Sequence, residues 1–465
     1  MNKILLPIAM ILLIVSSCKK NSFITSTDAS VNFSADTIFF DTVFASTGSI
    51  TQSVKIINNN NQQLLLSDVK LMGGNNSVFK ININGAAVSN VTNIEIDPND
   101  SIYVFVSVYI NPNANNLPFI LQDSIQVGFN GNTRYIQLQA YGQNAHFLSG
   151  QLITGSINWT NDLPYVILGG LTVDTNATLT IQRGCKIYCH ANAPFIVNGT
   201  LLIQGEKYDS THVSFQSDRL DPPYNNFPAG WPGIYFSPSS KDNVLEFAVI
   251  DNAYQAIVAL GLSTDANPKI ILNECVINNS YDAGILTVQS SVQARNCLIS
   301  NCGKNIEFTY GGTYNFSYCT VASYSNEFIS HSSPVLSMNN VSTDGTNATY
   351  SLTAHFVNCI FWGDGSLDNE VSVSQQSSAD VFDVNFAYCL WLEKTAPANI
   401  MVTSMLTTDP MFDSIDNRNL YYDFHLKNSS PAISYGTTAS APPFDLDGNP
   451  RVVNGFTDLG CFQKQ

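Results

Sequence analysis

The chain has 465 residues, of which 44% are hydrophobic and only 12% are charged. This composition excludes an intrinsically disordered chain, because apolar residues are plentiful, and it suits an all-β protein that stacks uncharged polar side chains. The net charge of −16 disfavours nucleic acid, anionic membrane surfaces and polyanionic sugars as direct partners.

The first 20 residues predict an export signal. Lys3 precedes an apolar run that ends at Val15, which is too short to span a membrane, and two serines stand before Cys18. The text VSSC resembles the lipobox of bacterial lipoproteins, in which the signal is cut before a cysteine that then carries lipid. We therefore expect a signal peptide over 1–17, lipidation at Cys18 and a linker over 18–30.

The resemblance also implies a place in the cell. Lys19 is not the aspartate that marks retention in the inner membrane, so an outer-membrane lipoprotein of the cell envelope is expected. The acidic stretch that often accompanies surface export is missing from KKNSF, which leaves the periplasmic and surface faces both open. Asp-Ser-Ile at Asp100, Asp123 and Asp413 resembles the O-glycosylation sequon of Bacteroidetes. A secretory signal with an incidental cysteine is the alternative.

Residues 31–145 predict a β-sandwich. VFKININ and IEIDPNDSIYVFVSVYI alternate or run apolar over strand lengths, and Asn130-Gly131 is a hairpin turn signal. The order of the segments resembles the immunoglobulin-like modules of the abnormal-spindle and hydin type. Such modules act as spacers or docking domains, so the resemblance implies position rather than chemistry.

Residues 150–465 contain a repeat with aligned columns. Three cysteines fall at equal intervals, and a β-branched residue follows each of them two positions later. Short β-branched segments with such a period predict coils of a parallel β-helix, which must stack to bury their apolar faces. Asparagine suits the bends, because it tolerates a left-handed backbone. The expected ladder residues are Ile250, Cys275, Ile277, Cys297, Ile299, Cys319 and Val321, with Asn252, Asn279 and Asn301 at the turns.

Three stretches resemble secreted, pectate-lyase-like right-handed β-helix proteins of environmental and gut bacteria. They are the opening coils around LTVDTNATLTIQRGCKIYC, the tryptophan-containing coil GWPGIYF, and the C-terminal end from DPMFDSIDNRNLYYDFHLKNSSPAISYG to DLDGNPRVVNGFTDLGCF. The resemblance implies a right-handed parallel β-helix with a C-terminal cap. It does not imply an activity.

The cysteines and histidines predict no metal site. Nine cysteines follow Cys18, most of them in apolar strand-like runs, which indicates buried thiols rather than a disulfide framework. Cys185, Cys189 and His190 lack a further ligand pair at zinc spacing. DLDGN at 445–449 looks calcium-like, yet the terminal glutamate of an EF-hand loop is absent and a capping turn explains it. We expect no cofactor, and calcium has no support in the residues.

One constellation could contact a carbohydrate. Arg219 stands beside Asp218 and Asp221, just before Trp231, which could serve as a stacking platform. A solvated loop with a structural tryptophan is the competing interpretation. The Gly-His-Gly and Arg-x-Lys tripeptides of polygalacturonases are absent, and the carboxylates of successive coils occupy different columns.

Two functions therefore stay open. The first is a lipid-anchored binding or scaffold protein whose β-helix meets a polysaccharide or an envelope protein, touching the membrane only through its lipid and binding no nucleic acid. The second is a polysaccharide lyase or glycoside hydrolase whose site comes together from separate coils. We favour the first, because no catalytic motif is found.

Overall fold

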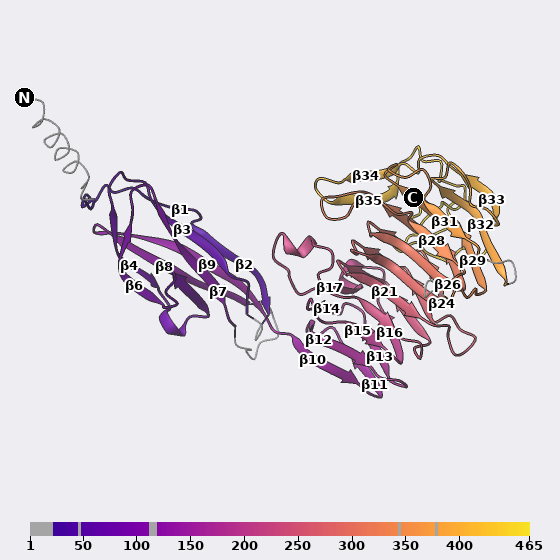
Figure 1. Cartoon of the computed structure of the whole chain (residues 1–465), viewed down its shortest axis with the longest axis horizontal. Helices are drawn as coiled ribbons and strands as arrows, with labels where there is room; N and C mark the ends of the chain where they lie inside the picture. The colour runs from indigo at the N-terminus through magenta and orange to yellow at the C-terminus, as the bar shows by residue number, and fades with distance from the viewer. Residues whose placement is uncertain (1–21, 45–47, 111–118, 343–345, 377–379) are drawn as a thin grey trace, which may run out of the picture. The chain divides into compact units, whose positions relative to one another are not determined.

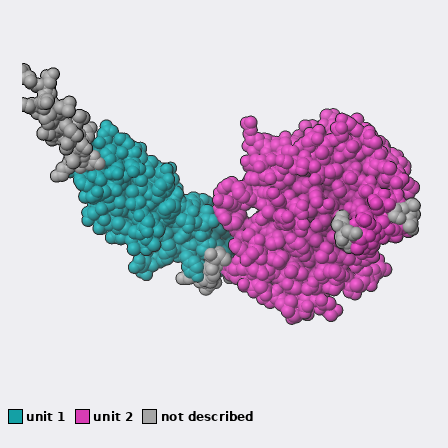
Figure 2. Space-filling model, viewed as in Figure 1, with its two compact units in different colours: residues 1–144 teal, residues 145–465 magenta. Residues whose placement is uncertain are grey.

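A computed structural model describes residues 22–44, 48–110, 119–342, 346–376 and 380–465. Two compact units comprise residues 1–144 and 145–465 (Figure 2). Within the described ranges, no helix is both long and apolar enough to cross a membrane. The predicted signal peptide and Cys18 lie outside the described residues.

The first unit is a β-sandwich around one apolar core. On β7, buried Val104 and Val106 alternate with exposed Tyr103 and Phe105, because one face of the sheet packs inward. One sheet has the order β1 (Val31–Phe33), β3 (Gln52–Asn58), β7 (Ser101–Val108) and β5 (Phe79–Ile83). The other has the order β2 (Thr37–Phe44), β9 (Asn132–Gln143), β8 (Phe119–Phe129), β4 (Leu64–Leu71) and β6 (Asn90–Ile96). All pairs are antiparallel except β2 with β9, and a short 3-10 turn, η1 (Gly74–Asn76), follows β4.

The second unit is a solenoid in which 24 strands, β10 to β33, pair in parallel and stack coil upon coil (Figure 1). Its coils form three ladders, and long strands bend to join two of them. The first ladder comprises β11 (Ser156–Trp159), β13 (Thr178–Gln182), β16 (Thr200–Gln204), β19 (Asn243–Glu246), β22 (Ile270–Asn273), the ends of β24 (Ala283–Arg295) and β26 (Lys304–Ser317), β29 (Leu352–Val357), the start of β32 (Phe382–Trp391) and β33 (Met401–Leu406).

The other two ladders close each coil. The second ladder comprises the starts of β10 (His146–Ile153) and β12 (Tyr165–Val173), β14 (Lys186–Cys189), β17 (Val213–Ser217), β20 (Ala248–Asp251), β23 (Val276–Asn278), β25 (Leu298–Ser300), β27 (Thr320–Ser323), β30 (Ile360–Gly363) and the end of β32. The third comprises the ends of β10 and β12, β15 (Phe195–Val197), β18 (Ile234–Phe236), β21 (Gln255–Leu260), the starts of β24 and β26, β28 (Leu336–Asn339) and β31 (Val371–Ser374). Two 3-10 turns, η2 (Asp209–Thr211) and η3 (Tyr224–Asn226), lie in loops.

Columns of similar apolar side chains, one from each coil, hold the solenoid together. Ile250 pairs with Ile277, which pairs with Ile299 and then Val321, all fully buried in one core. Parallel pairing places each such residue about 4.8 Å from its equivalent, so one apolar column buries several coils at once. The predicted all-β fold, a sandwich followed by a parallel β-helix, is confirmed.

The C-terminal segment packs against the side of the solenoid. It includes the hairpin of β34 (Phe412–Asp416) and β35 (Tyr421–Leu426). A separate apolar cluster joins Phe412, Phe424 and Leu446 of this segment to second-ladder residues of successive coils. Those residues are Leu298, Ala322, Ile360 and Leu390.

Candidate functional site

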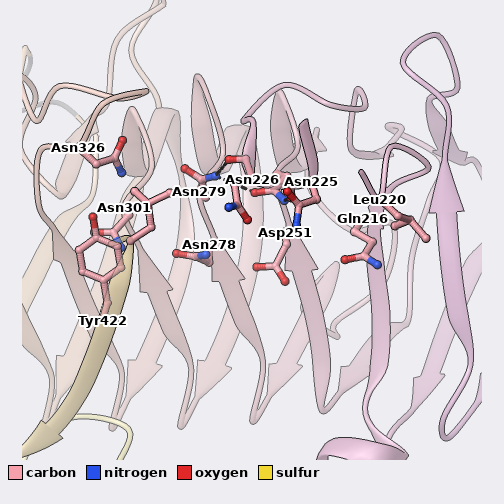
Figure 3. A pocket seen from close by; sticks show the side chains of 12 residues that line it. Gln216, Leu220, Asn225, Asn226, Asp251, Asn278, Asn279, Asn301, Asn326 and Tyr422 are labelled. Atoms are coloured by element: carbon pink, nitrogen blue, oxygen red, sulfur yellow. Dashed lines mark hydrogen bonds between the residues drawn. The ribbon is translucent and has the colours of Figure 1, made fainter. Parts of the chain in front are cut away.

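The main candidate is a cavity of about 340 Å³ where the second ladder bends into the third (Figure 3). Three polar side chains line it from the ends of adjacent strands: Gln216 on β17, Asp251 on β20 and Asn278 on β23. Asp251 and Asn278 are register partners, so both belong to one outward column. The other lining residues are Leu220, Asn225, Asn226, Asn252, Asn279, Asn301, Asn326, Leu420 and Tyr422.

Asparagines at the bends form the next column of the cavity. Asn252, Asn279 and Asn301 have φ values of 61°, 54° and 52°, the left-handed region that asparagine tolerates. The Asn279 amide donates to Asn252 Oδ1 at 2.7 Å, which fixes both side chains. The predicted turn ladder therefore also lines a cavity, a role that the sequence analysis did not assign to it.

An insertion between β17 and β18 contributes a wall. The side-chain amides of Asn252 and Asn279 donate to the backbone carbonyls of Asn225 and Asn226 at 2.8 and 2.9 Å. Because these bonds tie the insertion to the bends of two coils, the wall is held in place.

The other end of the cavity comes from more distant segments. Asn326 and Tyr422 lie beside Asn301 at the end opposite to Gln216 (Figure 3). Tyr422 belongs to β35, so the C-terminal hairpin supplies part of the lining.

Asp251 is the one residue with a charged side chain in this lining. Burial raises the pKa of its carboxyl to about 6, although a hydrogen bond with Asn278 acts in the opposite direction. Beside the cavity, Asn301 Nδ2 is buried without a hydrogen-bond partner among the described residues. A carboxyl with a pKa close to neutral pH and several amide groups suit a ligand that carries hydroxyl groups, because a hydroxyl both donates and accepts hydrogen bonds.

Of the two interpretations of Trp231, the structure supports the structural one and not the stacking platform. Its side chain is completely buried and stacks near Phe215 at a centroid distance of 6.3 Å, so it offers no face to a ligand. Its Nε1 donates instead to the backbone carbonyl of Asp251 at 2.9 Å. Trp231 therefore supports the strand end that carries Asp251.

The other residues expected to contact a carbohydrate are Asp218, Arg219 and Asp221. Their side chains pair with one another or with neighbouring side chains instead. Arg219 forms a bidentate pair with Asp221 at 2.8 and 3.0 Å and lies over the Tyr224 ring at 4.0 Å. Asp218 Oδ2 lies 2.8 Å from His190 Nδ1. These residues belong to the insertion or its start and brace it, but they do not line the cavity.

The described residues contain no cluster of three His, Cys, Asp or Glu side chains that could hold a metal ion. Cys185 and Cys189 are buried in the core. Asp445 of DLDGN is buried too, and it accepts hydrogen bonds from the backbone of Asn449 and Gln463, as in a folded cap.

No family model and no curated protein sequence matches the chain. Among solved structures, pectate lyase Pel9A is similar over 69% of this chain and 98% of its own, with 11% identity and a TM-score of 0.25. A family 123 glycoside hydrolase from Clostridium perfringens is similar over 26% of this chain, with 10% identity and a TM-score of 0.18. A protein from Porphyromonas gingivalis W83 is similar over 27%, with 7% identity and a TM-score of 0.19. The chain covers 30% and 60% of the latter two proteins.

Proposed function

We propose that the second unit is a glycan-binding module and that the cavity around Asp251 receives a neutral segment of the glycan. The observation that carries this proposal is the lining, in which asparagine and glutamine amides surround a single carboxyl. The Gln216 amide, the lining amide oxygens, each with two lone pairs, and the Asp251 carboxyl can bind several hydroxyl groups of one ligand. The negative net charge favours a neutral sugar over a uronic one.

Binding fits this lining better than catalysis does. A glycoside hydrolase uses two carboxyl groups, and β-elimination requires a base such as Lys or Arg, but the cavity presents one carboxyl and neither cation. A polysaccharide-cleaving enzyme is the second candidate, favoured by one observation. A carboxyl with a pKa of about 6 is suited to general acid–base chemistry near neutral pH.

Calorimetric titration of the purified full chain with linear neutral hexasaccharides of glucose, xylose, mannose and N-acetylglucosamine tests the binding proposal. We expect one of these sugars to bind, and Gln216→Ala to weaken binding about tenfold through lost hydrogen bonds. Gln293→Ala is the matched control, because Gln293 is an exposed glutamine of the first ladder outside the cavity lining. Equal binding by both variants would remove the cavity from the proposal.

An activity assay on the same sugars, and on uronic polysaccharides, separates the two candidates. Reducing ends and the absorbance of unsaturated uronates are followed with and without calcium. Product formation by the parent chain that is lost in Asp251→Asn would establish an enzyme in which Asp251 is the general acid or base.

We further propose that the chain is an outer-membrane lipoprotein of a Bacteroidetes-like bacterium, anchored at Cys18, with an immunoglobulin-like first unit as a spacer. The apolar segment, the small residues and the cysteine at its end support this proposal. Expressed with its signal in a Gram-negative host, the protein should enter the detergent phase, and Cys18→Ser should stay in the aqueous phase. Equal partition would leave an ordinary secretory signal.

A further inference from the structure

Two exposed tyrosines stack on neighbouring coils, just beyond the asparagine bends. The rings of Tyr254 and Tyr281 have centroids 6.0 Å apart and an interplanar angle of 24°. Both rings are exposed, with exposed fractions of 44% and 54%. Each follows its bend asparagine, Asn252 or Asn279, by two residues, so the pair belongs to two of the coils that line the cavity.

Stacking alone does not indicate a binding surface in this fold. Tyr310 and Tyr350 also stack at 6.0 Å, but both are half-buried. Exposure therefore distinguishes Tyr254 and Tyr281 from a purely structural ladder.

The next coil leaves one side of this pair uncovered. Gly303 follows Asn301 by two residues, and its backbone N–H donates to Ser280 at 3.0 Å. A Cβ at position 303 would lie only 2.3 Å from the Tyr281 carbonyl oxygen, so the close approach of these two coils requires glycine. Because glycine has no side chain, nothing from this position covers the ring of Tyr281.

The polar groups beside the tyrosines are fixed by hydrogen bonds and carry no excess of positive charge. Gln255 Nε2 donates to Asp282 Oδ2 at 2.6 Å, and Lys304 Nζ donates to Glu307 Oε2 at 2.8 Å. Such a fringe offers oriented hydrogen-bonding groups without a strong positive field, which suits a neutral polyol better than an anion.

We propose that Tyr254 and Tyr281 form a stacking platform for a neutral pyranose ring of the same glycan that enters the cavity. This inference rests on the proposed function and adds a second contact to it. The apolar C–H face of the sugar lies on the exposed ring, and its hydroxyl groups reach the fringe of Gln255, Asp282 and Lys304. An oligosaccharide that spans the cavity and the platform therefore gains affinity from both, whereas a sugar that occupies the cavity alone gains none from the platform.

Titration of the full chain with the binding hexasaccharide and with its disaccharide tests the platform. Tyr281→Ala and Tyr254→Ala should each weaken hexasaccharide binding roughly three- to tenfold, as expected for an aromatic contact, and leave disaccharide binding unchanged. Tyr281→Phe should retain binding, because the ring remains. Tyr135→Ala, which removes an exposed tyrosine from the first unit, is the control. Unchanged tryptophan fluorescence and melting temperature would show that the variants fold.

The outcomes separate the two proposals. If the cavity variant Gln216→Ala weakens binding and the tyrosine variants do not, the platform is overturned and the proposed function stands. If the tyrosine variants weaken binding and Gln216→Ala does not, the tyrosines bind the glycan by themselves, and the link between platform and cavity is overturned. If no neutral hexasaccharide binds, both are overturned.

Discussion

At the scale of single residues, Asp251 is the group on which the site depends most. It is half-buried, it stands between Gln216 and Asn278 at the ends of adjacent strands, and Trp231 holds its carbonyl. Neighbours in a solenoid column are about 4.8 Å apart, so like charges there would repel strongly. Amide neighbours avoid this repulsion, and Asn278 also forms a hydrogen bond with the carboxyl.

The raised pKa of Asp251 predicts how stability depends on pH. Between pH 3.8 and about pH 6 the Asp251 carboxyl binds a proton more tightly in the folded chain than in the unfolded chain. The free energy of unfolding therefore falls as pH rises through this window. Asp251→Asn should be more stable than the parent by about 1–2 kcal/mol near pH 7.5, after allowance for partial exposure, and equally stable near pH 4.

Urea unfolding followed by tryptophan fluorescence checks this prediction. All four tryptophans, Trp159, Trp231, Trp362 and Trp391, lie in the β-helix, so the signal reports on that unit alone. Asp41→Asn makes the same charge change at an exposed site of the first unit and should leave this transition unchanged. A stability difference that persisted at low pH would show that packing, not ionisation, separates Asp251 from Asn.

At the scale of elements, the spacing of the sequence predicts the columns but not the cavity. Ile277 and Asn279 repeat with the coil, and a parallel ladder turns a repeat in sequence into a stack in space. The cavity walls come from insertions and from the C-terminal hairpin, whose positions no repeat specifies. Asn226 and Tyr422 therefore carry no signal in the sequence, and the most conspicuous aromatic residue, Trp231, belongs to the core. An asparagine column beside a long insertion is the one pattern that could have indicated the site.

The C-terminal hairpin has its own electrostatic clamp. His425 on β35 lies 2.8 Å from Asp447 through Nε2 and 2.6 Å from Asp423 through Nδ1, and it stacks on Phe462 at 3.9 Å. The hydrogen bond with Asp447, reinforced by Asp423, raises the pKa of His425 to about 9. The clamp therefore contributes stability in full below about pH 6.5 and loses it as pH rises through about 9.

His425→Gln tests the clamp. At pH 6 the variant should unfold about 1 kcal/mol more easily than the parent, a modest value because the pair is partly exposed, and the difference should vanish above about pH 9. Limited proteolysis at both pH values gives the local readout, with cleavage expected first near the hairpin in the variant. A pH-independent difference would mean that His425 acts through its contact with Phe462.

At the scale of the whole molecule, the chemical reactivity of one column of buried thiols reports whether the coils of the solenoid are folded. Cys275, Cys297, Cys319, Cys359 and Cys389 are buried in successive coils, where the backbone carbonyl of each of the first four accepts a hydrogen bond from the next coil. Burial raises the pKa values of Cys275, Cys297, Cys319 and Cys359 well above 9. All nine cysteines in the described part of the chain are free and buried. Alkylation requires a thiolate that the reagent can reach, so these thiols should not react in the folded protein.

The order in which the thiols react with iodoacetamide at increasing urea tests how the coils unfold. Repeats that touch only their neighbours can melt one by one, and Cys389, in the last strand before β33, would then react first. The C-terminal segment packs across Leu298, Ala322, Ile360 and Leu390 of successive coils, so it should couple them into one transition. We expect the five column thiols to become reactive together, with site-resolved mass spectrometry as the measurement. Phe424→Ala, which loosens this packing, should split the transition and expose Cys389 at lower urea than Cys275. Early reaction of Cys389 in the parent chain would show instead that the coils open from the C-terminal end despite the segment that covers them.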